Sequence, residues 1–173
     1  KIEENLPIIQ HVPCLLFLVD LPGLLHKNQD TGEVERNLHG LFNIIINTIE
    51  KYDLRKKKSL IISFTKADLM AGREDLYGPL ALWEEDMFSD HLPALDEIGF
   101  YTRELITFSG LIESFFRDKF PMLYNTLSNN FMNLYFSVFS ALGHDPVKGI
   151  LEALEPKRIF DPIFFTLLNA GYL

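Results

Sequence analysis

Two short, continuously apolar runs flank a segment with helical periodicity. Residues 13–20 read Pro-Cys-Leu-Leu-Phe-Leu-Val-Asp and residues 59–64 read Ser-Leu-Ile-Ile-Ser-Phe, a pattern typical of strands that are buried on both faces. The order strand, helix, strand predicts a βαβ unit whose two parallel strands lie side by side. From about residue 37 to residue 52, apolar side chains recur at three- and four-residue spacing, as in an amphipathic helix: Leu38, Leu41, Phe42, Ile45, Ile46 and Ile49.

The remaining segments alternate between turn formers and further elements. Residues 21–37 have the composition of a loop, and residues 72–100 are mixed, with short helices expected. A third strand is expected at residues 134–139, and a final helix at residues 160–169, with Pro162 in its first turn and Gly171 after its end. A long helix, interrupted near Pro121, is predicted for residues 101–130, with a buried stripe that comprises Leu111, Phe115, Phe116, Phe120, Leu123 and Leu127.

These elements predict an α/β fold, a three-layer sandwich around a parallel sheet. We expect one domain over residues 1–173, with a helical insertion at residues 72–130, because neither an internal repeat nor a Gly/Ser-rich linker divides the chain.

Composition narrows the classes of partner. The net charge of −8 disfavours nonspecific binding to nucleic acid or anionic lipid. The basic run at residues 55–58 is interpreted as a solvated turn ahead of a strand. The apolar runs are too short to cross a membrane. A single cysteine, Cys14, within an apolar run predicts a buried thiol and a reducing compartment.

In doubly wound sheets, ligands bind beyond the carboxyl ends of the strands. Directly after the second strand stands Thr65-Lys66-Ala67-Asp68, which resembles the Asn/Thr-Lys-x-Asp guanine-specificity motif of GTPases. The resemblance implies that the Asp68 carboxylate accepts from the ring N1–H and the exocyclic amine of guanine, a pair of donors that adenine lacks. It also implies that the Lys66 stem lies over the base and that Thr65 ties the loop to its neighbours. The alternative for Asp68 is a helix cap after a strand.

The third strand is followed by Ser140-Ala141-Leu142, which resembles the segment of GTPases in which a backbone N–H contacts the guanine oxygen. Two such matches in the order that the family requires favour the guanine interpretation. The 72-residue separation is long for a small GTPase, and the predicted helical insertion accounts for it.

Asp20-Leu21-Pro22-Gly23 matches the Asp-x-x-Gly motif, in which Asp holds Mg²⁺ and Gly contacts the terminal phosphate. In a GTPase, however, another helix and strand separate that motif from the Lys-x-Asp strand, and only one helix fits between Asp20 and Thr65. We favour Asp20 as a strand-end residue and Gly23 as a turn, and the magnesium alternative stays open.

The whole pattern, including the Pro156-Lys157-Arg158 run before the closing helix, resembles the P-loop GTPases of the translation-factor-related (TRAFAC) class, among them the bacterial double-GTPase families. The resemblance covers about residues 13–70 and 131–173 and implies a cytoplasmic regulatory switch that works with other proteins. The sequence contains no Gly-x-x-x-x-Gly-Lys-Ser/Thr (Walker A) segment. We therefore expect this chain, which begins at Lys1, to be the base-recognition half of such a domain, with GTP or GDP and Mg²⁺ bound only when a preceding segment supplies the phosphate site.

Two other functions remain as alternatives. One is a pseudo-GTPase module that docks a protein partner with its aromatic helices, although core packing also explains Phe108, Phe115, Phe116 and Phe120. The other is an unrelated doubly wound domain, such as a hydrolase with a phosphate site. The five histidines lack the spacing of metal ligands, so a metal site made by protein ligands alone is not expected.

Overall fold

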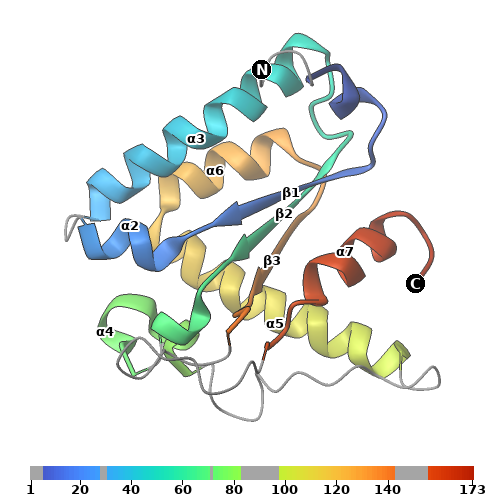
Figure 1. The fold of residues 1–173 in the computed structure, drawn as a ribbon. Helices are drawn as coiled ribbons and strands as arrows, with labels where there is room; N and C mark the ends of the chain where they lie inside the picture. The colour runs from blue at the N-terminus through green and yellow to red at the C-terminus, as the bar shows by residue number, and fades with distance from the viewer. Residues whose placement is uncertain (1–5, 28–30, 71, 83–97, 143–155) are drawn as a thin grey trace.

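A three-stranded parallel sheet forms the centre of the molecule. The computed structural model describes residues 6–27, 31–70, 72–82, 98–142 and 156–173. Strands β1 (Cys14–Val19), β2 (Ser59–Phe64) and β3 (Leu134–Val138) lie in the order β1-β2-β3 (Figure 1). Leu16 is level with Ile61, and Ile61 with Tyr135. The parallel βαβ unit and the third strand, predicted from the apolar runs, are confirmed.

Helices occupy the connections. α3 (Thr31–Lys51) joins β1 to β2, and α5 (Ile98–Lys119) and α6 (Pro121–Asn130) precede β3. The break between α5 and α6 falls where Pro121 opens the second helix, as predicted. α7 (Asp161–Asn169) closes the chain, with Pro162 in its first turn. The shorter elements are η1 (Leu6–Gln10), α2 (Leu21–Lys27), η2 (Ala67–Leu69), α4 (Glu74–Tyr77) and η3 (Gly78–Leu82).

Alternate side chains of β2 enter two apolar clusters, one on each face of the sheet. Leu60, Ile62 and Phe64 join the larger cluster, to which α3, α5 and α6 contribute. Ile61 points the other way and packs with Phe165 of α7 and with Leu105 of α5. The protein is therefore an α/β fold with helices over both faces of a parallel sheet, an arrangement compatible with a three-layer sandwich (Figure 1).

The two edges of the sheet differ. At the β3 edge, the backbone N–H of Phe136 donates to Ser109 Oγ of α5 at 2.8 Å, so the helix covers that edge. At the β1 edge, no further strand pairs within the described ranges. Leu16 and Leu18 of β1 lie on the same face of the sheet as Ile61 and α7, and they are 48% and 56% exposed, so α7 does not fully cover this face at β1.

The segment after β1 corrects one prediction. Residues 21–37 are not a loop: α2 begins at Leu21, and α3 begins at Thr31 rather than near residue 37. Val34 is fully buried and extends the apolar stripe of α3 by one turn toward its start. Pro22 suits a first helical turn, where the missing N–H has no intrahelical partner in any case. The helical periodicity of the apolar residues therefore prevails here over the turn-forming residues.

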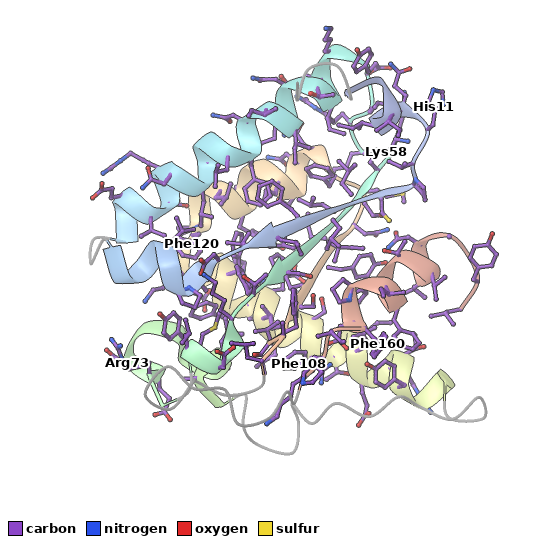
Figure 2. All side chains as sticks on the ribbon, viewed as in Figure 1. His11, Lys58, Arg73, Phe108, Phe120 and Phe160 are labelled. Carbon is purple, nitrogen blue, oxygen red and sulfur yellow. The ribbon has the colours of Figure 1, made fainter. Side chains whose placement is uncertain are left out.

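The basic run is solvated at three of its four positions. Arg55, Lys56 and Lys57 are exposed, but Lys58 is only 7% exposed. Its ammonium donates to the carbonyl oxygens of Gln10 at 2.9 Å and Val12 at 2.6 Å, which ties the start of β2 to the segment before β1 (Figure 2). The prediction of a solvated turn is wrong for Lys58, because these two carbonyls replace its water.

The aromatic residues of α5 are mostly core. Phe116 is fully buried, with ring centroids 5.1 Å from Phe136 and 5.3 Å from Phe120, and Phe108 is also buried. The predicted stripe is wrong at Leu111, which is partly exposed. Because Phe108, Phe116 and Phe120 pack inside the chain, they do not form an exposed surface for a partner.

The packing of α5 can be tested with one substitution at two positions. Ile112 is fully buried in the larger cluster, whereas Ile106 on the same helix is 48% exposed. Replacing a buried Ile with Ala removes apolar contacts and leaves a cavity, so Ile112→Ala should lower the free energy of unfolding by about 2–5 kcal/mol. Ile106→Ala should lower it by less than about 1 kcal/mol. Urea denaturation measures both values, and equal losses would contradict the orientation of α5.

Candidate functional site

The carboxyl ends of the three strands meet at one edge of the sheet. Val19, Phe64 and Val138 are level with one another. The residues that follow them, which include all the residues predicted to form a site, therefore leave the sheet at the same end (Figure 1). This placement follows from parallel pairing, because the strands share one direction.

The loop after β2 turns sharply at Lys66. Thr65 donates its backbone N–H to the Val19 carbonyl at 2.9 Å, and its hydroxyl points to the same oxygen at 3.4 Å, so the loop is tied to the end of β1. Lys66 then adopts a left-handed conformation with φ 62° and ψ 44°, which is uncommon for a residue with a side chain. The turn directs Ala67 toward β3, where its N–H donates to the Phe139 carbonyl at 3.2 Å.

Asp68 and Ser140 lie in contact, although 72 residues separate them. The Ser140 hydroxyl donates a hydrogen bond to Asp68 Oδ1, and the Leu142 backbone N–H donates to Ser140 Oγ at 3.2 Å. Ser140 is fully buried, Asp68 and Leu142 are partly buried, and Ala141 is exposed. One chain of hydrogen bonds thus runs from the backbone of the third loop to the carboxylate of the second.

This pair has the chemistry that a purine with adjacent donors requires. Each carboxylate oxygen has two acceptor positions, so one hydrogen bond from Ser140 orients Asp68 without using its capacity to accept more. The guanine donors N1–H and N2–H₂ match such a group. The acceptor capacity of Asp68 is therefore compatible with a guanine base, and Lys66 and Ala141, in the same two loops, are exposed.

Asp20 caps a helix. Its Oδ1 accepts the backbone N–H of Gly23 at 2.9 Å, three residues later in the first turn of α2, the bond that an N-cap side chain makes. Its Oδ2 accepts from Lys66 Nζ at 2.5 Å, in an exposed ion pair. A methyl group on Gly23 would lie 2.7 Å from Oδ2, so glycine permits this close approach.

The arrangement around Asp20 does not resemble a magnesium site. Mg²⁺ is held by oxygen ligands in octahedral geometry, whereas the Asp20 carboxylate already contacts the ammonium of Lys66. Among the residues placed by the structure, no three His, Cys, Asp or Glu side chains gather closely enough to hold a metal. The geometry favours Asp20 and Gly23 as the start of a helix.

Sequence reasoning did not single out a buried ionic cluster behind the third loop. Lys157 forms an antiparallel bridge with Ser140, with N···O distances of 3.1 and 2.9 Å. The next residue, Arg158, donates from Nε to Asp161 Oδ2 at 2.6 Å, and Tyr101 donates from its hydroxyl to Asp161 Oδ1 at 2.8 Å. An Asp directly before Pro162, with Arg three residues earlier, was the local signal for this cluster.

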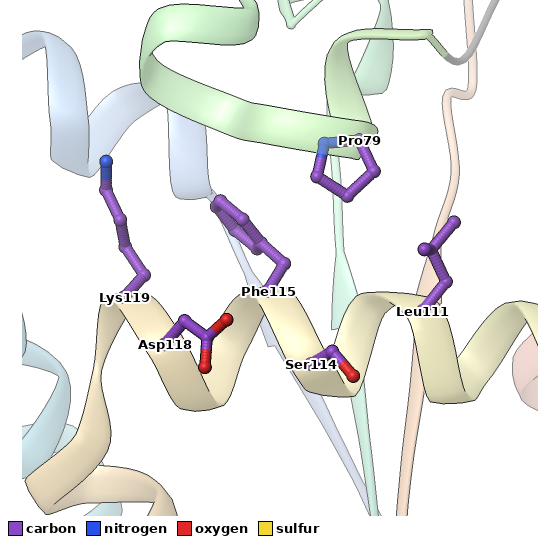
Figure 3. A pocket seen from close by; sticks show the side chains of 6 residues that line it. All are labelled: Pro79, Leu111, Ser114, Phe115, Asp118 and Lys119. Atoms are coloured by element: carbon purple, nitrogen blue, oxygen red, sulfur yellow. The ribbon is translucent and has the colours of Figure 1, made fainter.

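An open hollow of about 350 Å³ lies between η3 and α5 (Figure 3). Its lining combines Pro79, Leu111 and Phe115 with the polar residues Ser114, Asp118 and Lys119. None of these residues belongs to the predicted site. The lining mixes apolar side chains with one acidic and one basic side chain. The hollow adds no chemistry to the loops at the carboxyl ends.

No protein family, characterised protein or solved structure matched the sequence in our comparisons. Within the described ranges, the helices are too short or too polar to cross a bilayer.

Two helical glycines test the role of Asp20. A Cβ at Gly40 of α3 meets nothing within 4 Å, whereas a Cβ at Gly23 displaces the Asp20 carboxylate. Gly40→Ala should stabilise the protein by roughly 0.5–1 kcal/mol through helix propensity. Gly23→Ala should show no such gain, or a loss of about 1 kcal/mol, because the cap is broken. Thermal denaturation compares the two, and equal stabilisation would remove Asp20 from the cap.

Proposed function

We propose that the chain is the base-recognition half of a guanine-nucleotide-binding regulatory switch domain of the P-loop GTPase type. The contact between Asp68 and Ser140 carries the proposal, because it joins the two loops that the family resemblance assigns to the base. Thr65, Lys66 and Asp68 would form one side of the base site, and Ser140, Ala141 and Leu142 the other. The proposal includes a cytoplasmic protein that acts with other protein subunits.

Selectivity for guanine would come from the free-energy cost of burying the Asp68 carboxylate against a base that offers it no hydrogen-bond donor. Asp68 would accept from N1–H and N2–H₂ of guanine. Adenine offers an acceptor at its N1 position, so its binding would leave the carboxylate desolvated and facing a like partner. The Ser140 hydroxyl supports this by fixing the orientation of the carboxylate before the base arrives.

The open edge of β1 supports the proposal that this half needs a complement. Edge strands usually carry charged residues or proline, which prevent further pairing. β1 instead reads Cys-Leu-Leu-Phe-Leu-Val, the composition of a strand with neighbours on both sides. Leu16 and Leu18, on the face that carries α7, are exposed, so added structure beside β1 could also cover them. We propose that a strand bearing the phosphate-binding loop pairs here. The chain alone would then bind guanine nucleotides only weakly, through the base, and GTP or GDP with Mg²⁺ would bind firmly only to the completed sheet. Hydrolysis would belong to that complete domain.

The same exposed edge favours one alternative, a pseudo-GTPase interaction module. In that case a partner protein would pair with β1 and no nucleotide would be needed. The two functions differ in what they require of Asp68, because an interaction module that binds no nucleotide does not need a carboxylate that distinguishes guanine from adenine. Binding of guanine but not adenine nucleotides separates the two functions.

Asp68→Asn tests the base site in the complete domain, in which the phosphate-binding segment is present. An amide donates where the carboxylate only accepts, so affinity for GDP should fall by roughly 10–100-fold, the equivalent of one charge-assisted hydrogen bond of about 1.5–3 kcal/mol. Affinity for xanthosine diphosphate, which has a carbonyl in place of the exocyclic amine, should rise. Isothermal titration calorimetry measures both.

Asp118→Asn is the matched control, since it removes the same charge from an exposed position on α5. It should leave both affinities unchanged. If Asp68→Asn also leaves them unchanged, Asp68 does not contact the base and the proposed site is wrong.

A further inference from the structure

A buried carboxylate stands at the junction of α5, α7 and the segment that pairs with Ser140. Asp161 is fully buried at the start of α7. Both of its oxygens accept from side chains: Oδ2 from Arg158 Nε at 2.6 Å and Oδ1 from the Tyr101 hydroxyl at 2.8 Å. The Arg158 guanidinium also lies over the ring of Phe108, 4.1 Å from its centroid. We call Tyr101, Phe108, Arg158 and Asp161 the Asp161 cluster.

Such a cluster is costly to build for stability alone. Moving an ion pair out of water costs several kcal/mol per charge, and apolar residues of similar volume often serve stability as well or better. The cost is offset here because two donors satisfy the carboxylate and an aromatic face covers the guanidinium. The cluster restricts the position of the Asp161 carboxylate, because each of its two oxygens accepts a hydrogen bond from a different side chain.

That geometry is transmitted to the third loop through the backbone. Arg158 adopts a left-handed conformation with φ 56°, and its carbonyl accepts the N–H of Asp161 at 3.2 Å, so residues 158–161 form a tight turn. Lys157, directly before this turn, exchanges two backbone hydrogen bonds with Ser140. Ser140 in turn donates to Asp68. The path from Asp161 to Asp68 therefore consists of one turn, one bridge and one hydroxyl.

We propose that Asp161, held by Tyr101 and Arg158, is a positioning residue for base recognition. In the described part of the chain, the side-chain hydrogen bonds of Asp161 go to Tyr101 and Arg158 and not to a residue of the proposed base site. It fixes the Lys157 backbone, which holds Ser140 and the 140–142 loop at the distance from Asp68 that a purine requires. This inference rests on the proposed function and adds a specificity determinant outside the motifs that suggested it.

The test compares two Tyr→Phe variants. Tyr101→Phe removes the hydroxyl that donates to Asp161 Oδ1 at 2.8 Å, and Tyr124→Phe removes one that donates to Glu113 Oε1 at 2.6 Å, between α6 and α5. Each loses one hydrogen bond from a tyrosine to a carboxylate, and only the first lies on the path to Ser140. Tyr101→Phe also keeps the ion pair between Asp161 and Arg158, whereas Asp161→Ala would leave the buried Arg158 without this partner, a strongly destabilising change.

Two readouts are measured on the whole chain. The first is hydrogen exchange at the backbone amides of Ser140 and Lys157, corrected for the global stability of each variant. The second is ligand-observed NMR with four diphosphates: those of guanosine, adenosine, inosine, which lacks the exocyclic amine, and 6-thioguanosine, in which sulfur replaces O6 while N1–H and the amine remain. Sulfur is a weaker acceptor than oxygen, so the replacement of O6 reports on the 140–142 loop, and loss of the amine reports on Asp68.

Tyr101→Phe should raise exchange at Ser140 and Lys157 at least tenfold and remove the preference for guanosine over 6-thioguanosine diphosphate. The preference for guanosine over inosine diphosphate should persist. Tyr124→Phe should change neither readout. If the wild-type chain does not distinguish guanosine from adenosine diphosphate, the proposed function fails and this inference with it. If the wild type does distinguish them and Tyr101→Phe matches it in exchange and preference, only the positioning role of the Asp161 cluster is overturned.

Discussion

The hydrogen bond from Ser140 to Asp68 joins two loops that are remote in sequence, and the rest of the site depends on it. It forms because β2 and β3 are parallel neighbours that end level with each other, so the residues after them start from the same edge of the sheet. The left-handed turn at Lys66 then directs the second loop toward the third. An antiparallel or non-adjacent pair of strands would not bring these groups together.

Backbone hydrogen bonds hold both of the loops that this bond joins. Thr65 ties the second loop to β1, and Lys157 ties the third loop to the turn before α7. The Asp161 cluster lies behind that turn and commits a buried charge to holding it in place. At the opposite margin, the β1 edge is open and apolar. These contacts are the basis of our proposal that the chain holds a preformed base site on a sheet that has room for another strand.

Much of this was predictable from sequence where the signal is local and continuous. Residues 59–64 are apolar without interruption, and the predicted strand matches β2 residue for residue. Parallel order then placed Asp68 and Ser140 at one edge. The helix α2 was missed because its 7 residues are too few for a clear periodic pattern and because the bond from Gly23 to Asp20 at its start is visible only in the structure. The burial of Lys58 and the pairing of Tyr101 with Asp161 depend on partners 46–60 residues away, which composition and spacing do not reveal.

The central claim is that the second and third loops close on one guanine base. Titration of the isotopically labelled chain with guanosine diphosphate, followed by amide chemical shifts, tests it most directly. The account predicts that the amides of residues 67–69 and 141–142 shift together along one binding curve, and that adenosine diphosphate at the same concentration leaves them in place. Equal shifts with both nucleotides, or shifts confined to one of the two loops, would contradict it.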